Sequence, residues 1–435
     1  MRSNPVYLLL AASIYIAVLF AVYDNYLFAI FEYAHFHHVA RTFGQTAISV
    51  ALGFVPLLAD RGGNSLGRLF SAVIYSLYYL PAIVITLLSL ERPYGDVLLL
   101  HGCLCLSMSM IFFAGSLFPP RGADKPISKA ARQAFSLITL ILIGIIVAAY
   151  GGHIRLVSFS DVYDLRTENT DLVNPIVGYF VMWLSYGLLP FVLSCGIVYR
   201  EKVGWLLGLL GCLMIYGATG AKTAALTPVF VFGLYFLSKQ KGDILPILLA
   251  TISSVCLAFM YLAPDDGVFG ALKAVLFMRT VATPGWALSI YYDFFAVHPL
   301  TYLSQVGIIN SITQAYSYGG SGLGQVLGIE ISGTAAANFN TGFWASEGIA
   351  SFWLVGIPIS GAFVSLYLVV LNRVTRGYDG LFLRAWACGF AMSLLNLPFF
   401  TALLSGGGLL MLAMALSLPH WTPQRRRKPY GTITA

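Results

Sequence analysis

The sequence predicts an all-α, polytopic integral membrane protein with about twelve transmembrane helices. Of its 435 residues, 58% are hydrophobic and only 10% are charged. A soluble domain carries about 25% charged residues, so this chain has more apolar surface than a water-soluble core of its length can bury. The apolar residues also gather into long runs, and we therefore expect lipid to be the solvent for a single transmembrane domain over residues 1–435.

The apolar runs give the positions of the predicted helices. Twelve of them are long enough to cross a bilayer, at 6–23, 43–59, 69–90, 97–118, 135–151, 173–198, 203–218, 223–238, 244–263, 348–371, 381–399 and 403–419. The seventh and eighth runs are short and are joined only by the turn from Ala218 to Lys222, so a re-entrant pair is the alternative there.

Lysines and arginines set the expected orientation, because cations near the ends of spans are retained on the cytoplasmic side. With a cytoplasmic N-terminus, most of the 25 Lys and Arg residues fall in inward segments, including the cluster from Arg425 to Lys428. Both termini of a multi-pass inner-membrane protein would then lie in the cytoplasm. The positive charge is spread over short segments without interleaved aromatics, so no nucleic-acid partner is expected. The outward cations are Arg41, Arg92, Arg155, Arg166, Lys222, Lys273 and Arg279.

Two outward segments are too long to be plain turns. They are residues 153–172 and residues 264–347, and we expect both to be periplasmic loops. Within the second, Phe269 to Met278 and Trp286 to Val297 have the composition of short helices that could lie at the membrane surface. The pair Pro284-Gly285 predicts a break between them.

Outward cations oppose the orientation bias and need a local reason, of which phosphate binding is one. Arg166 closes the run DVYDLR at 161–166, where a planar guanidinium could grip a diphosphate with two hydrogen bonds. The alternative is an exposed ion pair with Asp164 or Glu168. Arg279 lies in an apolar stretch, so we expect it to be partly buried, with either an anion or Asp293 as its partner.

Lys222 and Arg155 are weaker candidates for phosphate contacts. Lys222 ends a Gly-Ala-Lys-Thr fragment that lacks the earlier glycine and the strand of a nucleotide-binding loop, so a nucleotide site is rejected. A contact with a lipid-linked phosphate stays open for it, against simple extension to the membrane interface. Arg155 stands at the outer end of the fifth run and could equally mark the membrane boundary.

A polar segment leads into the tenth run. It combines Asn338, Asn340 and Glu347 with aromatic residues, a mixture used for sugar hydroxyls and pyranose faces. The alternative is helix capping with an interfacial aromatic belt. No metal site is expected, because the histidines at 35, 37 and 38 have only Glu32 as a nearby carboxylate.

Several of these motifs, in the same order, resemble the Wzy-type oligosaccharide repeat-unit polymerases of bacterial surface polysaccharides. The resemblance covers roughly residues 150 to 360, whereas the flanking spans match only in being apolar. The motifs are Tyr163-Asp164-Leu165-Arg166, Thr219 to Thr223, Arg279 with its following Pro-Gly, Tyr291 to Phe295 with Tyr292 and Asp293, and Asn338-Phe339-Asn340.

The resemblance implies a glycosyltransferase-C-like architecture and an enzyme that needs no metal or other cofactor. Such O-antigen polymerases use undecaprenyl diphosphate-linked units in polysaccharide and lipopolysaccharide biosynthesis, with a flippase and a chain-length regulator as possible partners. Arg166, Lys222 and Arg279 would correspond to the basic residues that neutralise the leaving diphosphate. Asp164, Asp293 and Glu347 are candidates for the general base, and Asp164 is favoured because it shares a motif with Arg166.

Two other functions stay open at this point. A polysaccharide flippase or other transporter would place charges in the middle of its spans, whereas these spans are nearly free of charge. An O-antigen ligase would use the same leaving group, so only analysis of its product would separate it from a polymerase.

Overall fold

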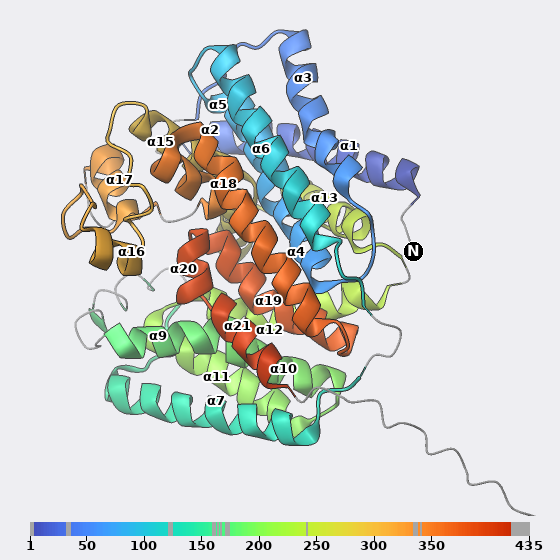
Figure 1. Ribbon diagram of the computed structural model, residues 1–435, viewed down its shortest axis with the longest axis vertical. Coiled ribbons are helices and arrows are strands. Elements are labelled where there is room, and N and C mark those ends of the chain that lie inside the picture. Colours follow the sequence, from blue (N-terminus) through green and yellow to red (C-terminus); the bar gives the residue numbers. More distant parts are fainter. Residues whose placement is uncertain are drawn as a thin grey trace, which may run out of the picture.

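The computed structural model describes residues 4–31, 36–120, 125–158, 162, 165, 168–169, 175–240, 242–333, 338–339 and 342–418. These residues form an all-α bundle (Figure 1). In chain order its α-helices are α1 (Pro5–Val22), α2 (Phe28–Ile30), α3 (Phe43–Phe54), α4 (Leu66–Ile74), α5 (Leu80–Ser89), α6 (Tyr94–Gly115), α7 (Lys129–Tyr150), α9 (Pro175–Trp183), α10 (Leu189–Val198), α11 (Lys202–Thr219), α12 (Lys222–Lys239), α13 (Ile244–Leu262), α14 (Gly267–Leu276), α15 (Thr283–Phe295), α16 (Gly307–Thr313), α17 (Leu323–Ser332), α18 (Phe343–Thr375), α19 (Gly380–Asn396), α20 (Phe399–Leu404) and α21 (Gly408–Ser417).

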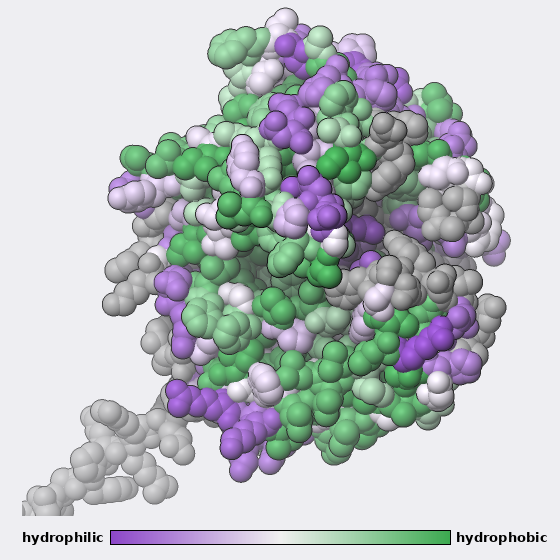
Figure 2. Space-filling view, turned by 180° about the vertical axis from the view of Figure 1, so that it is seen from behind, coloured by the Kyte–Doolittle hydropathy of each residue, from purple (hydrophilic) through white to green (hydrophobic). Residues whose placement is uncertain are grey.

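The composition and length of these helices confirm a membrane protein. Within the described ranges, nine helices are long and apolar enough to cross a bilayer. The other three predicted runs are also helical, as α3 with its 3₁₀ extension to Ala59, α12 and α19, but they fall outside those nine. One face of the molecule is broadly hydrophobic over its lower half (Figure 2), as lipid contact requires.

Three prolines are accommodated by π turns. The π turns at Tyr75–Tyr79, Leu184–Leu188 and Phe277–Ala282 each end two residues before a proline, namely Pro81, Pro190 and Pro284. A proline lacks the N–H of a regular helix and its ring crowds the preceding turn, and a local widening relieves both effects. The predicted break at Pro284-Gly285 is therefore wrong, because the backbone passes directly from the π turn into α15.

Glycine at position 285 lets α15 enter the bundle. A side chain there would collide with Ile85 of α5, so the two helices meet closely only because Gly285 has none. The aromatic residues Tyr291, Tyr292, Phe294 and Phe295 of α15 are buried. Much of α15 is therefore packed against the rest of the bundle.

Helix α18 is broken near its start. Phe352 and Trp353 have non-helical backbone angles, with φ of +57° at Trp353, so Phe343–Ser351 forms a separate helical segment. That segment folds back until Gly348 packs against the backbone of Gly356. Its last carbonyls accept hydrogen bonds from the backbone of 301 and 302, at 2.8 and 3.3 Å, which satisfies the exposed helix end.

Candidate functional site

Parts of the two long loop segments lie on one side of the molecule. Helices α16 and α17, within the second segment, and the start of α9, which follows the first, are all at the left of Figure 1, whereas the N-terminal helix begins at the right. Seen from behind, the surface also has a hollow with hydrophilic residues near it (Figure 2).

The first loop segment docks on the turn between α11 and α12. The backbone N–H of Arg155 donates to the Gly217 carbonyl at 3.1 Å, and the Tyr216 hydroxyl donates to the Val157 carbonyl at 2.6 Å. Farther along the loop, Asn169 Nδ2 donates to the Ala218 carbonyl at 2.8 Å. These bonds fix both flanks of the loop to the last turn of α11.

Lys222 follows, in sequence, the end of α11 on which that loop docks. Gly220 ends α11 with φ of +63°, a left-handed conformation that glycine adopts without strain, and Lys222 then begins α12. On the loop side, the Arg155 guanidinium pairs with Glu168 at 2.5 Å, and both side chains are 53% exposed. The fold thus gathers Arg155 and Lys222 around one turn.

Four of the predicted site residues, Tyr163, Asp164, Arg166 and Asn340, lie outside the described residues. Val162 and Leu165, which belong to the same run as Arg166, are fully buried.

Arg279 differs from its prediction. It was expected to be partly buried, but its side chain is exposed, because Phe277, Met278, Val281 and Ala282 occupy the buried face of the π turn. No carboxylate in the described part of the chain lies within ion-pair distance of it. No hydrogen bond between described residues joins it to the α11–α12 turn either.

Asp293, the carboxylate expected near Arg279, has another partner. Its Oδ1 accepts a hydrogen bond from Arg92 Nε at 2.7 Å, and the same guanidinium lies 5.9 Å from the centre of the Tyr292 ring. Asp293 and Tyr292 are therefore linked to the segment between α5 and α6. The predicted alternative pair of Arg279 with Asp293 is wrong.

Asn338 lies at an anchored point of the chain. Its side chain is exposed, but the next residue, Phe339, is buried edge-on against Trp286 with 5.0 Å between ring centres. The Tyr291 hydroxyl donates to the Phe339 carbonyl at 3.1 Å. Burial raises the pKa of Tyr291 above its ordinary value, which keeps the hydroxyl protonated and able to donate.

Glu347 is a buried helix cap. It is 3% exposed, and its Oε2 accepts the Phe400 N–H at 3.1 Å, at the start of α20. Its Oε1 has no hydrogen-bond partner among the described residues. Capping was the alternative expected at this segment, and Glu347 caps α20 instead of its own helix.

Three outward cations that were left without a role have structural partners. Arg41 donates to the carbonyls of Leu87, Leu90 and Arg92 at the end of α5, and burial lowers its pKa. Lys273 is buried, and its ammonium group pairs with Asp265 at 2.7 Å near the end of α13. Together with Arg92, these residues stabilise helix ends and loops, so the remaining outward cations are the better candidates for a ligand.

The sequence reasoning missed a buried charge cluster. Arg68 is 1% exposed and pairs with Asp60 at 2.8 Å and with Asp243 at 2.5 Å. In the sequence, Arg68 is one of the inward cations beside a predicted span and so indicates only the orientation. The available signal was that Arg68 opens one apolar run and Asp243 precedes another.

Comparison with protein-family models, with curated proteins and with solved structures gives no match.

Proposed function

We propose that this protein is a membrane glycosyltransferase that joins undecaprenyl diphosphate-linked oligosaccharide units into a surface polysaccharide. The observation that supports this most is the docking of the first loop on the α11–α12 turn, which puts Arg155 and the flanks of Arg166 beside the turn that carries Lys222. Arg279 adds an exposed guanidinium without a described carboxylate partner. An exposed guanidinium of this kind suits a diphosphate ligand.

The reaction needs such cations at the leaving group. The bond between the anomeric carbon of the donor glycan and the diphosphate oxygen breaks, while a hydroxyl of the incoming unit forms the new glycosidic bond. Negative charge builds on the leaving diphosphate, and cations already aimed at it stabilise the transition state. The acceptor hydroxyl proton goes to a carboxylate acting as general base.

Asp164 is the best remaining candidate for that base. Asp293 is engaged by Arg92, and Glu347 is buried and holds the Phe400 amide. Each of these two carboxylates therefore already has a structural contact. Asp164 shares its motif with Arg166, which would put acid–base chemistry beside the leaving group.

The topology belongs to the same proposal. Helices α3, α12 and α19 would complete twelve spans of a glycosyltransferase-C-like enzyme, with both termini in the cytoplasm. The two long loops would then face the periplasm of the bacterial inner membrane, where a flippase delivers lipid-linked units.

A complementation experiment tests the activity. In a deletion strain, Arg166→Ala or Arg279→Ala should abolish long polymer while lipid-linked single units persist. Lys239→Ala is the matched control, because Lys239 is an exposed cation at the opposite end of α12 from Lys222. Full-length polymer from both arginine variants would contradict the site assignment.

A purified assay separates the rival functions. The protein in vesicles should lengthen lipid-linked units without any further acceptor. A ligase would transfer glycan only when lipid A core is added, and a transporter would move units across the bilayer without changing their length.

A further inference from the structure

Trp353 has a backbone conformation that is unfavourable for tryptophan. Its φ of +57° and ψ of −151° lie in a region that only glycine adopts without strain. The preceding helical segment is fixed, because the carbonyls of Ala350 and Ser351 accept hydrogen bonds from the backbone of 301 and 302. Strain of this kind gathers at ligand sites, so the position of the Trp353 side chain needs an explanation.

The Trp353 ring belongs to a small cluster of aromatic and charged side chains. It packs against the Tyr292 ring with 4.9 Å between ring centres, and the Arg92 guanidinium lies 5.9 Å from the centre of the Tyr292 ring. Arg92 Nε in turn donates to Asp293 at 2.7 Å. The cluster therefore joins α15 to the broken start of α18 and to the segment that follows α5, and α15 packs on both of these helices (Figure 1).

Much of the hydrogen-bonding capacity of this cluster is not used by the described residues. The Asp293 side chain is 50% exposed, and only its Oδ1 accepts a hydrogen bond from them. The Tyr292 hydroxyl and the indole N–H of Trp353 have no partner among the described residues. Burial raises the pKa of the Tyr292 hydroxyl, and the charges of Asp96 and Asp293 raise it further, so this hydroxyl stays protonated and can donate.

The charge of the cluster suits a neutral ligand. The charges of Arg92 and Asp293 cancel, and Asp96 adds a negative charge close to Tyr292, so a diphosphate is disfavoured. A neutral sugar offers hydroxyls for a carboxylate and a phenol, and an apolar ring face for an indole.

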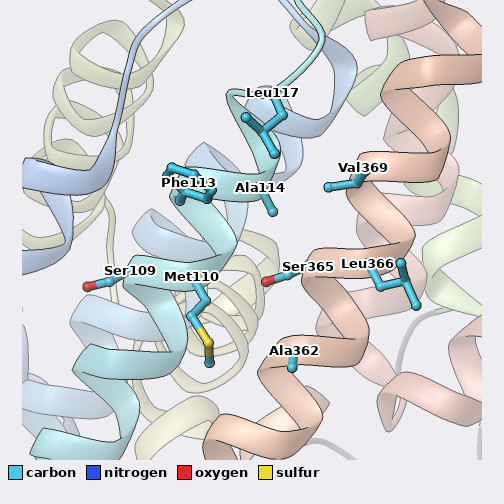
Figure 3. Close-up of a pocket in the computed structure, with 9 residues that line it drawn as sticks. All are labelled: Ser109, Met110, Phe113, Ala114, Leu117, Ala362, Ser365, Leu366 and Val369. Carbon is cyan, nitrogen blue, oxygen red and sulfur yellow. The ribbon is translucent and has the colours of Figure 1, made fainter.

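The groove between α6 and α18 shows the contrast. It measures about 430 Å³, and Figure 3 shows its lining residues. Its two serines, Ser109 and Ser365, donate at 2.7 and 2.8 Å to carbonyls of their own helices, and the other lining residues are apolar. A sugar in this groove would leave most of its hydroxyls without a partner.

We propose that Trp353, Tyr292 and Asp293 form a subsite for a neutral sugar of the oligosaccharide substrate. The Trp353 ring covers a face of the pyranose, and the Tyr292 hydroxyl and Asp293 Oδ2 bind its hydroxyls. Arg92 is a positioning residue, because it holds Asp293.

This subsite rests on the proposed glycosyl transfer. Arg279 and Tyr292 lie on one continuous helical stretch, formed by the π turn and α15, and are about 20 Å apart along its axis. If Arg279 binds the leaving diphosphate, the sugar at Tyr292 lies farther along the unit than the reacting sugar. Its binding energy should then affect KM and leave kcat nearly unchanged.

The test uses the glycan without its lipid carrier. Oligosaccharide is released by mild acid from the lipid-linked units of the deletion strain, and its binding to the full-length protein in bilayer discs is measured by isothermal titration. Trp353→Leu and Asp293→Asn should each weaken binding about tenfold, as expected for the loss of one good contact. Inorganic pyrophosphate should not displace the oligosaccharide.

Two further variants separate binding from folding. Trp205→Leu is the matched control, because Trp205 is 49% exposed on α11 and takes no part in the cluster, so binding should stay at the wild-type level. Trp353→Gly relieves the backbone strain and removes the ring, and it should lose the sugar as Trp353→Leu does. Thermal unfolding verifies that each variant is folded.

Three results would overturn the subsite. In the first, the wild-type protein lengthens lipid-linked units but does not bind the released oligosaccharide. In the second, the Trp353 and Asp293 variants bind it as tightly as Trp205→Leu does. In the third, pyrophosphate displaces it, which would assign the sugar to the diphosphate site. A protein that binds the oligosaccharide through Trp353 and Asp293 but lengthens no units would contradict the proposed transfer and support the subsite.

Discussion

Arginine plays opposite parts in two regions of this bundle. Arg68 is buried and held by two aspartates, whereas Arg279 is exposed and has no carboxylate partner in the described part of the chain. A buried guanidinium is tolerated only when its charge and its donors are satisfied, so Arg68 is fixed by the fold. An exposed guanidinium without a carboxylate partner keeps its donors for a ligand. The presence or absence of a carboxylate partner, and not the residue type, distinguishes a structural cation from a candidate functional one.

The buried cluster ties several elements together. Asp243 also caps α13, accepting the Leu245 N–H at 3.1 Å, and Asp60 accepts a hydrogen bond from Ser116 beyond the end of α6 at 3.3 Å. Arg68 belongs to α4. Four helix ends or loops therefore depend on one guanidinium.

The largest effect is expected from removing that guanidinium. Arg68→Ala leaves two buried carboxylates without their partner, and we expect a loss of about 3–5 kcal/mol in the free energy of unfolding. Denaturant titration of the purified protein in detergent measures it. Arg61→Ala, at an exposed position in the loop that precedes α4, is the control and should change stability little. Equal stability of the two variants would contradict the proposed difference between a buried and an exposed arginine.

The next effect concerns activity and not stability. Arg279→Ala should leave unfolding unchanged, because the side chain is exposed, but slow chain extension by about 10²–10³-fold if it stabilises the leaving diphosphate. Arg279→Lys keeps the charge and loses the planar fork, so it should recover only part of the rate. The initial rate of extension of lipid-linked units measures both. A normal rate in the alanine variant would mean that an exposed, unpaired arginine is not a sufficient sign of function here.

Substitution of Glu347 is expected to have a smaller effect on stability. Glu347→Ala removes the cap of α20 and should cost about 1 kcal/mol of stability. Glu347→Gln keeps an oxygen for the Phe400 N–H, so both stability and extension rate should stay near wild type. An inactive but stable glutamine variant would instead make Glu347 the general base and displace Asp164.

The local sequence pattern predicted the helices well. It could not predict ion pairs between residues that lie far apart in the sequence. Every predicted apolar run is helical over most of its described length, because burial in lipid depends on local composition. Asp243 lies 175 residues from Arg68 in sequence, and Arg92 lies 201 residues from Asp293, so nothing local indicates that these pairs will form. The break assigned to Pro284 failed for a related reason, since a π turn that absorbs a proline has no signature in the proline itself.

The smallest expected effect tests the α11–α12 turn itself. Arg155 and Glu168 are each 53% exposed, so Glu168→Gln should change stability by less than about 1 kcal/mol. The substitution also releases the guanidinium of Arg155, whose backbone is docked on the last turn of α11. If this turn receives the lipid diphosphate, the variant should bind donor more tightly, with a lower KM that rises again with salt, because an added cation strengthens a screened attraction. An unchanged KM would place Arg155 with the structural arginines and leave Arg166, Lys222 and Arg279 to carry the ligand.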